Sequence, residues 1–223
     1  MVKAIFYKEW IKTRRSVWLA AAVMAGCTAY AFVESGQEFR LSGAVQVWYG
    51  AIVKDAPLLP AVMQWVPAFV GVLLSLSQFV PEMTDRRLKL TLHLPAREDA
   101  LLASLLAYGA VVLVLLYALT CAVLAVGFSA IYPPEIVGSM VLDSLPWFLA
   151  GICAYLLTAW ICMEPVWRFR IAYGLVGACL CAFFFVDGPA GACLPAIPYL
   201  TLFTLLCFFF PFHSAGRFKE GAR

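Results

Sequence analysis

Long apolar runs alternate with short polar segments along the whole chain. Six runs approach or exceed the length of about 20 residues that a helix needs to cross a bilayer. The sixth contains Pro195 and Pro198, which predict a broken or re-entrant outer part. The pattern predicts an all-α polytopic membrane protein, a single domain over residues 1–223, with six transmembrane helices near 17–33, 57–80, 100–128, 145–162, 171–186 and 192–212.

The first 15 residues follow a different pattern. Wound as a helix, they have an apolar side and an opposite basic side, which is typical of a helix lying in the headgroup plane. We predict an interfacial helix at 1–15 that contacts membrane lipid; a solvated basic N-terminus is the alternative. We interpret the run that follows as a retained span, although Ala29-Tyr30-Ala31 resembles a signal-peptide cleavage site. The apolar side holds Val2, Phe6, Trp10 and Thr13, and the basic side holds Lys8, Lys12 and Arg15.

Charge sets the predicted orientation. Hydrophobic residues make up 64% of the chain and charged residues 13%, about half the charged share of soluble proteins. Every Lys and Arg except Arg40 and Lys54 falls in the segments 1–15, 81–99, 168–170 or the C-terminal tail. By the positive-inside rule these segments are cytoplasmic. We therefore predict both termini in the cytoplasm and the chain in the cytoplasmic (inner) membrane of a bacterium.

The two longest outer segments are predicted to be loops. Residues 34–56 include Trp48 and Tyr49, which suit a segment resting on the outer interface. Residues 129–143 carry Pro133-Pro134. Neither segment is large enough for a folded extracellular domain.

The chain lacks the residues that several kinds of chemistry require. The chain has no G-x-x-x-x-G-K-[ST] motif, so we expect no enzyme activity, no cofactor and no nucleic-acid partner. Its two histidines, His93 and His213, lie in predicted cytoplasmic segments, so no metal or haem site is expected within the spans. The eight cysteines are scattered through apolar runs, where free Cys behaves as a small hydrophobe. The predicted spans also lack the internal charges that ion-coupled transporters use.

Mildly polar or small residues mark two of the spans. Gln64, Gly71, Ser75 and Gln78 fall on one helical face of the second span. They line either a translocation path or a two-fold interface, or they serve helix–helix packing. In the fifth span Gly174, Gly177, Ala178 and Cys181 form a small-residue stripe, which we interpret as a site of close helix packing.

The longest charged segment between two apolar runs is 81–99, PEMTDRRLKLTLHLPARED. Together with the basic N-terminal helix around Lys8-Glu9-Trp10 and the six spans, it resembles the permease subunits of ABC-2 type transporters. In that family the second span ends near a Glu, here Glu82. A coupling helix follows, and then a Leu-Pro-x-Arg element, here Leu94-Pro95-Ala96-Arg97. The N-terminal helix resembles the family's elbow helix.

The resemblance implies an exporter subunit without catalytic residues of its own. A second permease copy or a paralogue would complete the path, and a separate cytoplasmic ABC ATPase subunit would bind ATP and Mg. Alternating leucines and basic residues suit a loop that docks into such a partner. The implied coupling residues are Glu82, Arg86, Arg87, Leu88, Leu90, Leu94, Pro95 and Arg97.

Two other classes stay open. A membrane scaffold or assembly factor would share the topology but need no ATPase. An intramembrane enzyme is disfavoured, because Gly127-Phe128-Ser129 has no accompanying intramembrane His. Uncharged spans suit an amphiphilic or lipid-like solute, a polysaccharide or a hydrophobic peptide better than a bare ion.

Overall fold

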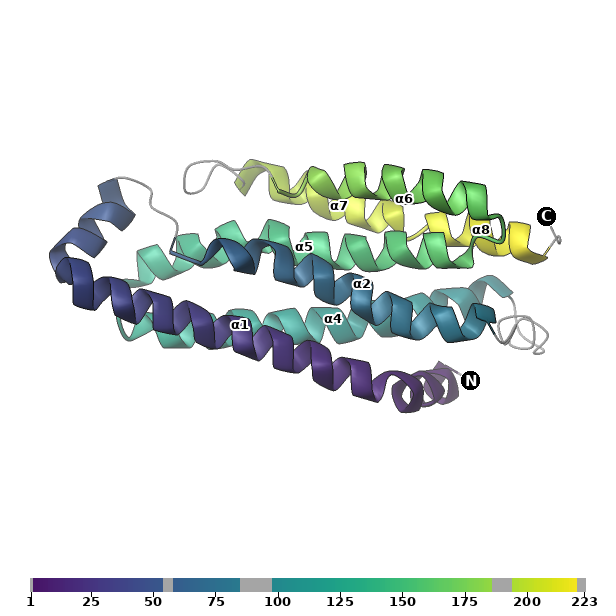
Figure 1. Cartoon of the computed structure of the whole chain (residues 1–223), viewed down its shortest axis with the longest axis horizontal. Helices are drawn as coiled ribbons and strands as arrows, with labels where there is room; N and C mark the ends of the chain where they lie inside the picture. Colours follow the sequence, from purple (N-terminus) through teal and green to yellow (C-terminus); the bar gives the residue numbers. More distant parts are fainter. Residues whose placement is uncertain (1, 54–57, 85–97, 186–193, 220–223) are drawn as a thin grey trace.

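The chain is an elongated helical bundle (Figure 1). Its computed structural model describes residues 2–53, 58–84, 98–185 and 194–219, and every regular element within these ranges is a helix. The predicted all-α class is therefore confirmed. The elements are α1 (Val2–Val53), α2 (Ala61–Thr84), α4 (Glu98–Ser129), α5 (Pro134–Met163), α6 (Trp167–Ala182), the 3-10 turn η1 (Leu194–Ala196), α7 (Ile197–Cys207) and α8 (Phe210–Lys219).

Five helical stretches are long and apolar enough to cross a membrane. They are α1, α2, α4, α5 and the stretch Leu194–Arg217, which joins η1, α7 and α8. The remaining predicted span, the fifth at 171–186, corresponds to α6, whose 16 residues fall short of the usual length of a membrane-spanning helix. Pro195 lies in η1 and Pro198 in the first turn of α7, and η1 runs directly into α7, so the predicted break at these prolines is not seen within 194–207. The stretch is interrupted instead at Phe208–Phe209, between α7 and α8.

The predicted outer loop at 34–56 is wrong. Helix α1 continues through Glu34 to Val53, and only Gly43, at φ 77° and ψ 153°, leaves the helical conformation. The Glu, Gln and Arg residues that interrupt the apolar pattern here are good helix formers, so the helix continues where the apolar run ends. Glycine adopts positive φ without the clash that a Cβ would cause, so the helix turns at Gly43. Figure 1 shows the part after this turn pointing away from the rest of α1.

The predicted loop at 129–143 is also mostly wrong. Helix α4 ends at Ser129 and α5 begins at Pro134, so only four residues connect them. Proline is favoured in the first turn of a helix because its missing N–H has no partner there in any case. The Pro133-Pro134 pair thus starts α5 earlier than its apolar run suggests.

Helix α5 is the centre of the bundle. It packs against α2 and α4 on one side and against α6, α7 and α8 on the other, while α1 packs on α2 and α4. Both chain ends, the last turn of α2 and the first turn of α4 lie at the same end of the molecule (Figure 1). That end also carries Lys12, Arg170 and Arg217, and we call it the basic end.

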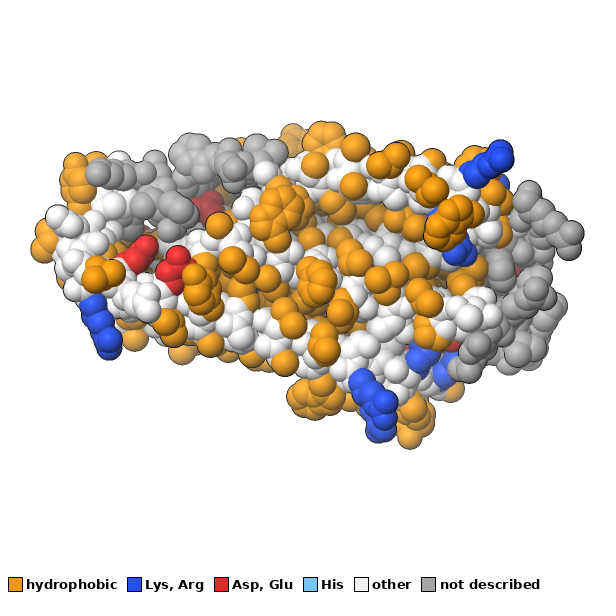
Figure 2. Space-filling view, viewed as in Figure 1, with side chains coloured by type: hydrophobic (Ala, Val, Ile, Leu, Met, Phe, Trp, Pro, Cys, Tyr) orange, Lys and Arg blue, Asp and Glu red, His pale blue; other side chains and the backbone are white. Residues whose placement is uncertain are grey.

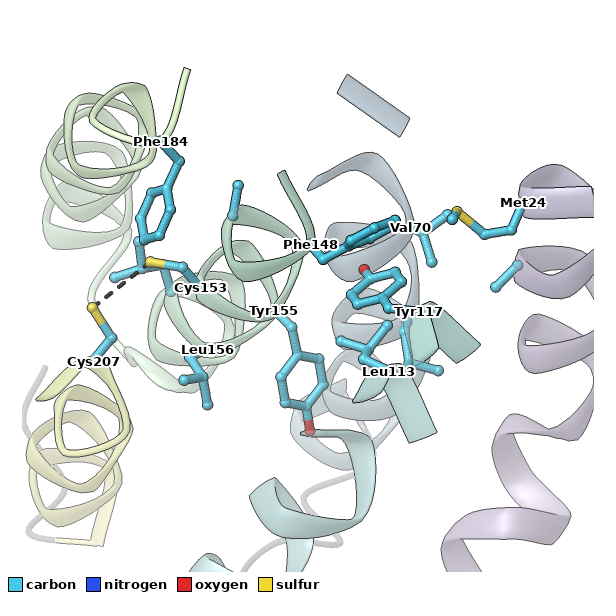
Figure 3. Close-up of a cluster of buried hydrophobic side chains, with 14 of the residues drawn as sticks. Met24, Val70, Leu113, Tyr117, Phe148, Cys153, Tyr155, Leu156, Phe184 and Cys207 are labelled. Carbon is cyan, nitrogen blue, oxygen red and sulfur yellow. Dashed lines mark hydrogen bonds between the residues drawn. The ribbon is translucent and has the colours of Figure 1, made fainter. Parts of the chain in front are cut away.

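Glycines let α2 and α5 cross at close range. A Cβ on Gly71 of α2 would collide with the backbone carbonyl of Gly151 on α5. Beside the crossing, the Tyr117 hydroxyl of α4 donates to the Pro67 carbonyl at 2.8 Å. Figure 3 shows Tyr117 and Phe148 against this part of the core, where their ring centroids are 5.2 Å apart.

Candidate functional site

Four charged side chains meet at the basic end, where the N-terminal part of α1 packs on the last turn of α2. Lys12 Nζ lies 2.7 Å from Glu9 Oε2 and 2.9 Å from Glu82 Oε1. Lys8 Nζ lies 3.1 Å from the same Glu82 oxygen. We call this neutral group of two lysines and two glutamates (Lys8, Glu9, Lys12 and Glu82) the ionic junction.

The ionic junction is buried unevenly. Glu9 and Glu82 are fully buried, the Lys12 side chain is 15% exposed, and the Lys8 side chain is 45% exposed. A buried carboxylate is costly unless a cation and hydrogen bonds compensate for lost water. Lys12 therefore carries much of the compensation, because it contacts both carboxylates and is the more buried of the two lysines. The Oε2 atom of Glu82 has no hydrogen-bond partner among the described residues.

The inward side of the N-terminal helix differs from the predicted one. Thr13 is buried and shares a 2.8 Å hydrogen bond with the Tyr108 hydroxyl of α4, and Phe6 packs edge-on against the Tyr108 ring at 5.5 Å. Lys12, predicted near lipid phosphates, points instead into the protein toward Glu82. The inward stripe, which contains Ile5, Glu9 and Thr13, runs between the predicted apolar and basic sides. Trp10 and Arg15 remain exposed.

Among the predicted coupling residues, the structure describes only Glu82. It occupies the last turn of α2 and is held by Lys8 and Lys12 within the chain. The other predicted coupling residues lie outside the described residues: Arg86, Arg87, Leu88, Leu90, Leu94, Pro95 and Arg97. Glu82 thus links the predicted elbow helix to the start of the predicted coupling segment.

The polar residues of the second span face inward. Gly71, Ser75, Gln78 and Glu82 are all buried on one face of α2, which we call the inner face. The Gln78 amide nitrogen donates to the Leu105 carbonyl at 2.9 Å, and the Tyr155 hydroxyl donates to the Gln78 amide oxygen at 2.8 Å. These are contacts of helix packing, the alternative to a path or a two-fold interface, because α4 and α5 cover them. Gln64, about two helical turns before Gly71 on α2, is half-buried.

The small-residue stripe of α6 corrects a second prediction. No atom of another element lies within 4 Å of the position that a Cβ on Gly174 would take, and a Cβ on Gly177 would make only ordinary contacts with Leu157 and Ile161 of α5, the nearest at 3.7 Å. The glycines of the stripe therefore do not mark a tight helix crossing of the kind that Gly71 makes with Gly151. The stripe lines an open groove of about 570 Å³ between α2, α5 and α6.

A second charged group at the basic end was not predicted. Glu164, fully buried just after α5, accepts a hydrogen bond from the Ser214 hydroxyl at 2.8 Å and pairs with Arg217 at 3.2 Å. Arg170 donates from Nε to the Glu164 backbone carbonyl at 2.6 Å. The group ties α8 and α6 to the end of α5. An acid at the end of an apolar run, followed by two arginines, was the available signal.

The described cysteines are free, as predicted. Cys153 of α5 and Cys207 of α7 are buried with their sulfurs 3.8 Å apart (Figure 3). No group of three or more His, Cys, Asp or Glu in the described ranges has the arrangement of a metal site.

Comparison of the chain with protein-family models, with curated proteins and with solved structures gives no match.

Proposed function

We propose that the chain is the membrane-spanning permease subunit of an ABC-2 type ATP-driven exporter. Two such subunits form the path, and each docks a separate ATPase through residues 81–99. The observation that carries the proposal is the ionic junction. It joins the N-terminal helix to the last turn of α2, at the point where the predicted coupling segment begins.

The arrangement of charges supports this function in physical terms. A force applied to the segment after α2 must reach the spans through groups that do not slip. Glu82 is held by two lysines of another helix, and Gln78 one turn earlier is held by backbone and side-chain hydrogen bonds to α4 and α5. Displacement of this end of α2 would therefore move α1, α4 and α5 together.

The test is affinity purification from a mild detergent, with neighbouring reading frames expressed together with the chain. Mass spectrometry looks for a co-purifying P-loop ATPase, and ATP hydrolysis is assayed on the same sample. We expect the native chain to retain an ATPase and the Arg86→Glu/Arg87→Glu variant to lose it, because charge reversal would repel the carboxylates of the partner.

The matched control is Arg14→Glu/Arg15→Glu, which reverses the same number of charges on the exposed side of the N-terminal helix. It should keep the ATPase. If no ATPase accompanies the native chain in several detergents, the exporter has no energy source and a scaffold or assembly factor of the same topology replaces it. Equal loss in both variants would show a general charge effect and contradict docking through residues 81–99.

A further inference from the structure

The groove between α2, α5 and α6 has the size and lining of a ligand site. Its volume of about 570 Å³ lies within the range of small-molecule sites. In Figure 2 the surface between α2 and α6 is hollowed on the visible face. Except for Thr158 and Cys181, the lining is apolar or glycine, with Trp65, Ala68 and Val72 from α2, Ala154, Leu157 and Ile161 from α5, and Gly174, Gly177, Ala178, Ala182 and Phe185 from α6 and the residues after it.

One end of the groove is closed by aromatic rings. Trp65 of α2 and Phe185, after α6, stack with their centroids 4.3 Å apart. From there the small residues of α6 keep the groove open toward the basic end. An apolar channel of this form inside a bilayer is filled by hydrocarbon, because an empty apolar cavity forfeits dispersion contacts along its walls.

The other end of the groove is charged. A second hollow of about 310 Å³ is lined by Arg170, Thr84, Cys162 and three apolar residues. It lies next to the first along α6, because Arg170 precedes Gly174 by about one helical turn on the same face of that helix.

Arg170 has no carboxylate partner among the described residues. It donates hydrogen bonds to the backbone carbonyls of Glu164 and Cys162. The nearby Glu164 carboxylate is taken by Arg217 and Ser214. The Arg170 guanidinium lies 5.9 Å from the exposed Trp167 ring, and tryptophan at a helix end is typical of the headgroup level.

From this geometry we infer that the groove binds an anionic phospholipid. One acyl chain lies along the small-residue stripe of α6, and the phosphate lies against Arg170, whose remaining N–H groups suit a tetrahedral anion. A second copy of the chain explains the groove less well, because an apolar helix face would leave the charge of Arg170 uncompensated. The site is independent of any ATPase partner.

The test uses phosphatidylglycerol and phosphatidylcholine that carry a photoactivatable group near the end of one acyl chain. Each is reconstituted with the full chain in nanodiscs, and labelled peptides are mapped by mass spectrometry. We expect phosphatidylglycerol to label the α2 and α6 lining residues. Arg170→Gln should reduce the ratio of phosphatidylglycerol labelling to phosphatidylcholine labelling about fivefold. Arg168→Gln, at an exposed position two residues away, should leave this ratio unchanged.

A pair of filling variants separates the groove from the general lipid surface. Gly174→Leu/Ala178→Leu should abolish labelling of the lining, whereas Gly26→Leu, at an exposed glycine of α1 with open space around it, should leave it unchanged. Equal labelling by both lipids would overturn the assignment of an anionic ligand. Absence of labelling from the lining, together with cross-links between two copies from a benzoylphenylalanine at position 178, would show that a second chain occupies the groove.

Discussion

Glycines have opposite effects on the two sides of α2. On the inner face, the backbone of Gly151 fills the space beside Gly71. Gln78 is hydrogen-bonded and Glu82 is ion-paired to neighbouring helices. On the side that faces α6, glycines on the neighbouring helix leave a groove of about 570 Å³. The inner face thus has no spare volume, while the groove side has volume and, beside it, Arg170, which has no carboxylate partner among the described residues.

The difference shows that a glycine has no fixed role in a helical membrane protein. Small residues allow close helix approach only when the opposite helix supplies backbone at the same level, as Gly151 does for Gly71. Gly174 faces no such partner. Packing density on the two sides of α2 therefore predicts different responses to the same substitution.

The largest effect is expected where the inner face ends, at Lys12. Lys12→Met removes the largely buried cation that contacts both Glu9 and Glu82, and leaves buried carboxylates. We expect a loss of about 3–5 kcal/mol in the free energy of unfolding. Equilibrium unfolding in mixed micelles measures it. Lys8→Met is the control: the Lys8 side chain is 45% exposed and its pair with Glu82 is partly screened by water, so it should cost clearly less than Lys12→Met. Equal losses would contradict the role given to Lys12.

Gly71→Ala tests the α2–α5 crossing. The added methyl group meets a backbone carbonyl, so the helices must separate, and overpacking of this kind costs about 1–3 kcal/mol. The free energy of unfolding is measured as for Lys12→Met. The control is Ala68→Gly on the groove side, which removes one methyl group where Gly71→Ala adds one. A Gly71→Ala protein as stable as the native chain would show that the crossing is looser than described.

Tyr155→Phe tests the hydrogen bonds of the inner face. The change keeps the ring but removes the donor to Gln78, at a cost of about 1 kcal/mol. Combining it with Gln78→Leu forms a double-mutant cycle. A coupling energy of zero between the two positions would contradict the hydrogen bond.

Gly174→Ala tests the groove side and has the smallest expected effect. The Cβ enters open space, and alanine is favoured over glycine within helices, so stability should rise by up to about 1 kcal/mol. A loss comparable to that of Gly71→Ala would mean that the two sides of α2 are equally packed, and the contrast between them would fail.

Much of this architecture follows from hydrophobic pattern. The apolar runs placed α2, α4, α5 and α6 within a few residues of their positions, apart from the early start of α5, because helices in lipid must be apolar over a fixed length. The continuation of α1 past Glu34 did not follow, since charged residues weaken a membrane span without weakening a helix.

The site was predicted only in outline. The spacing of the polar residues in α2 predicted that they share one helical face. It did not predict that α4 and α5 cover this face. The sequence offered Lys8, Glu9, Lys12 and Glu82 as separate surface charges, because a contact across 70 residues depends on how α1 packs on α2. Whether a glycine stripe is covered by another helix or lines a groove depends on the helix opposite it. The spacing of residues within one helix does not predict this.

The turn at Gly43 has a consequence for experiments on sidedness. From Val2 to Gly43, α1 is long enough to extend about 60 Å, roughly twice the hydrocarbon thickness of a bilayer. A helix of this length that crosses the bilayer places Gly43 and the N-terminal end of α1 in water or headgroups on opposite sides. A cysteine at position 43, treated with a thiol reagent that cannot cross lipid, reports directly which side of the vesicle the far end of α1 occupies.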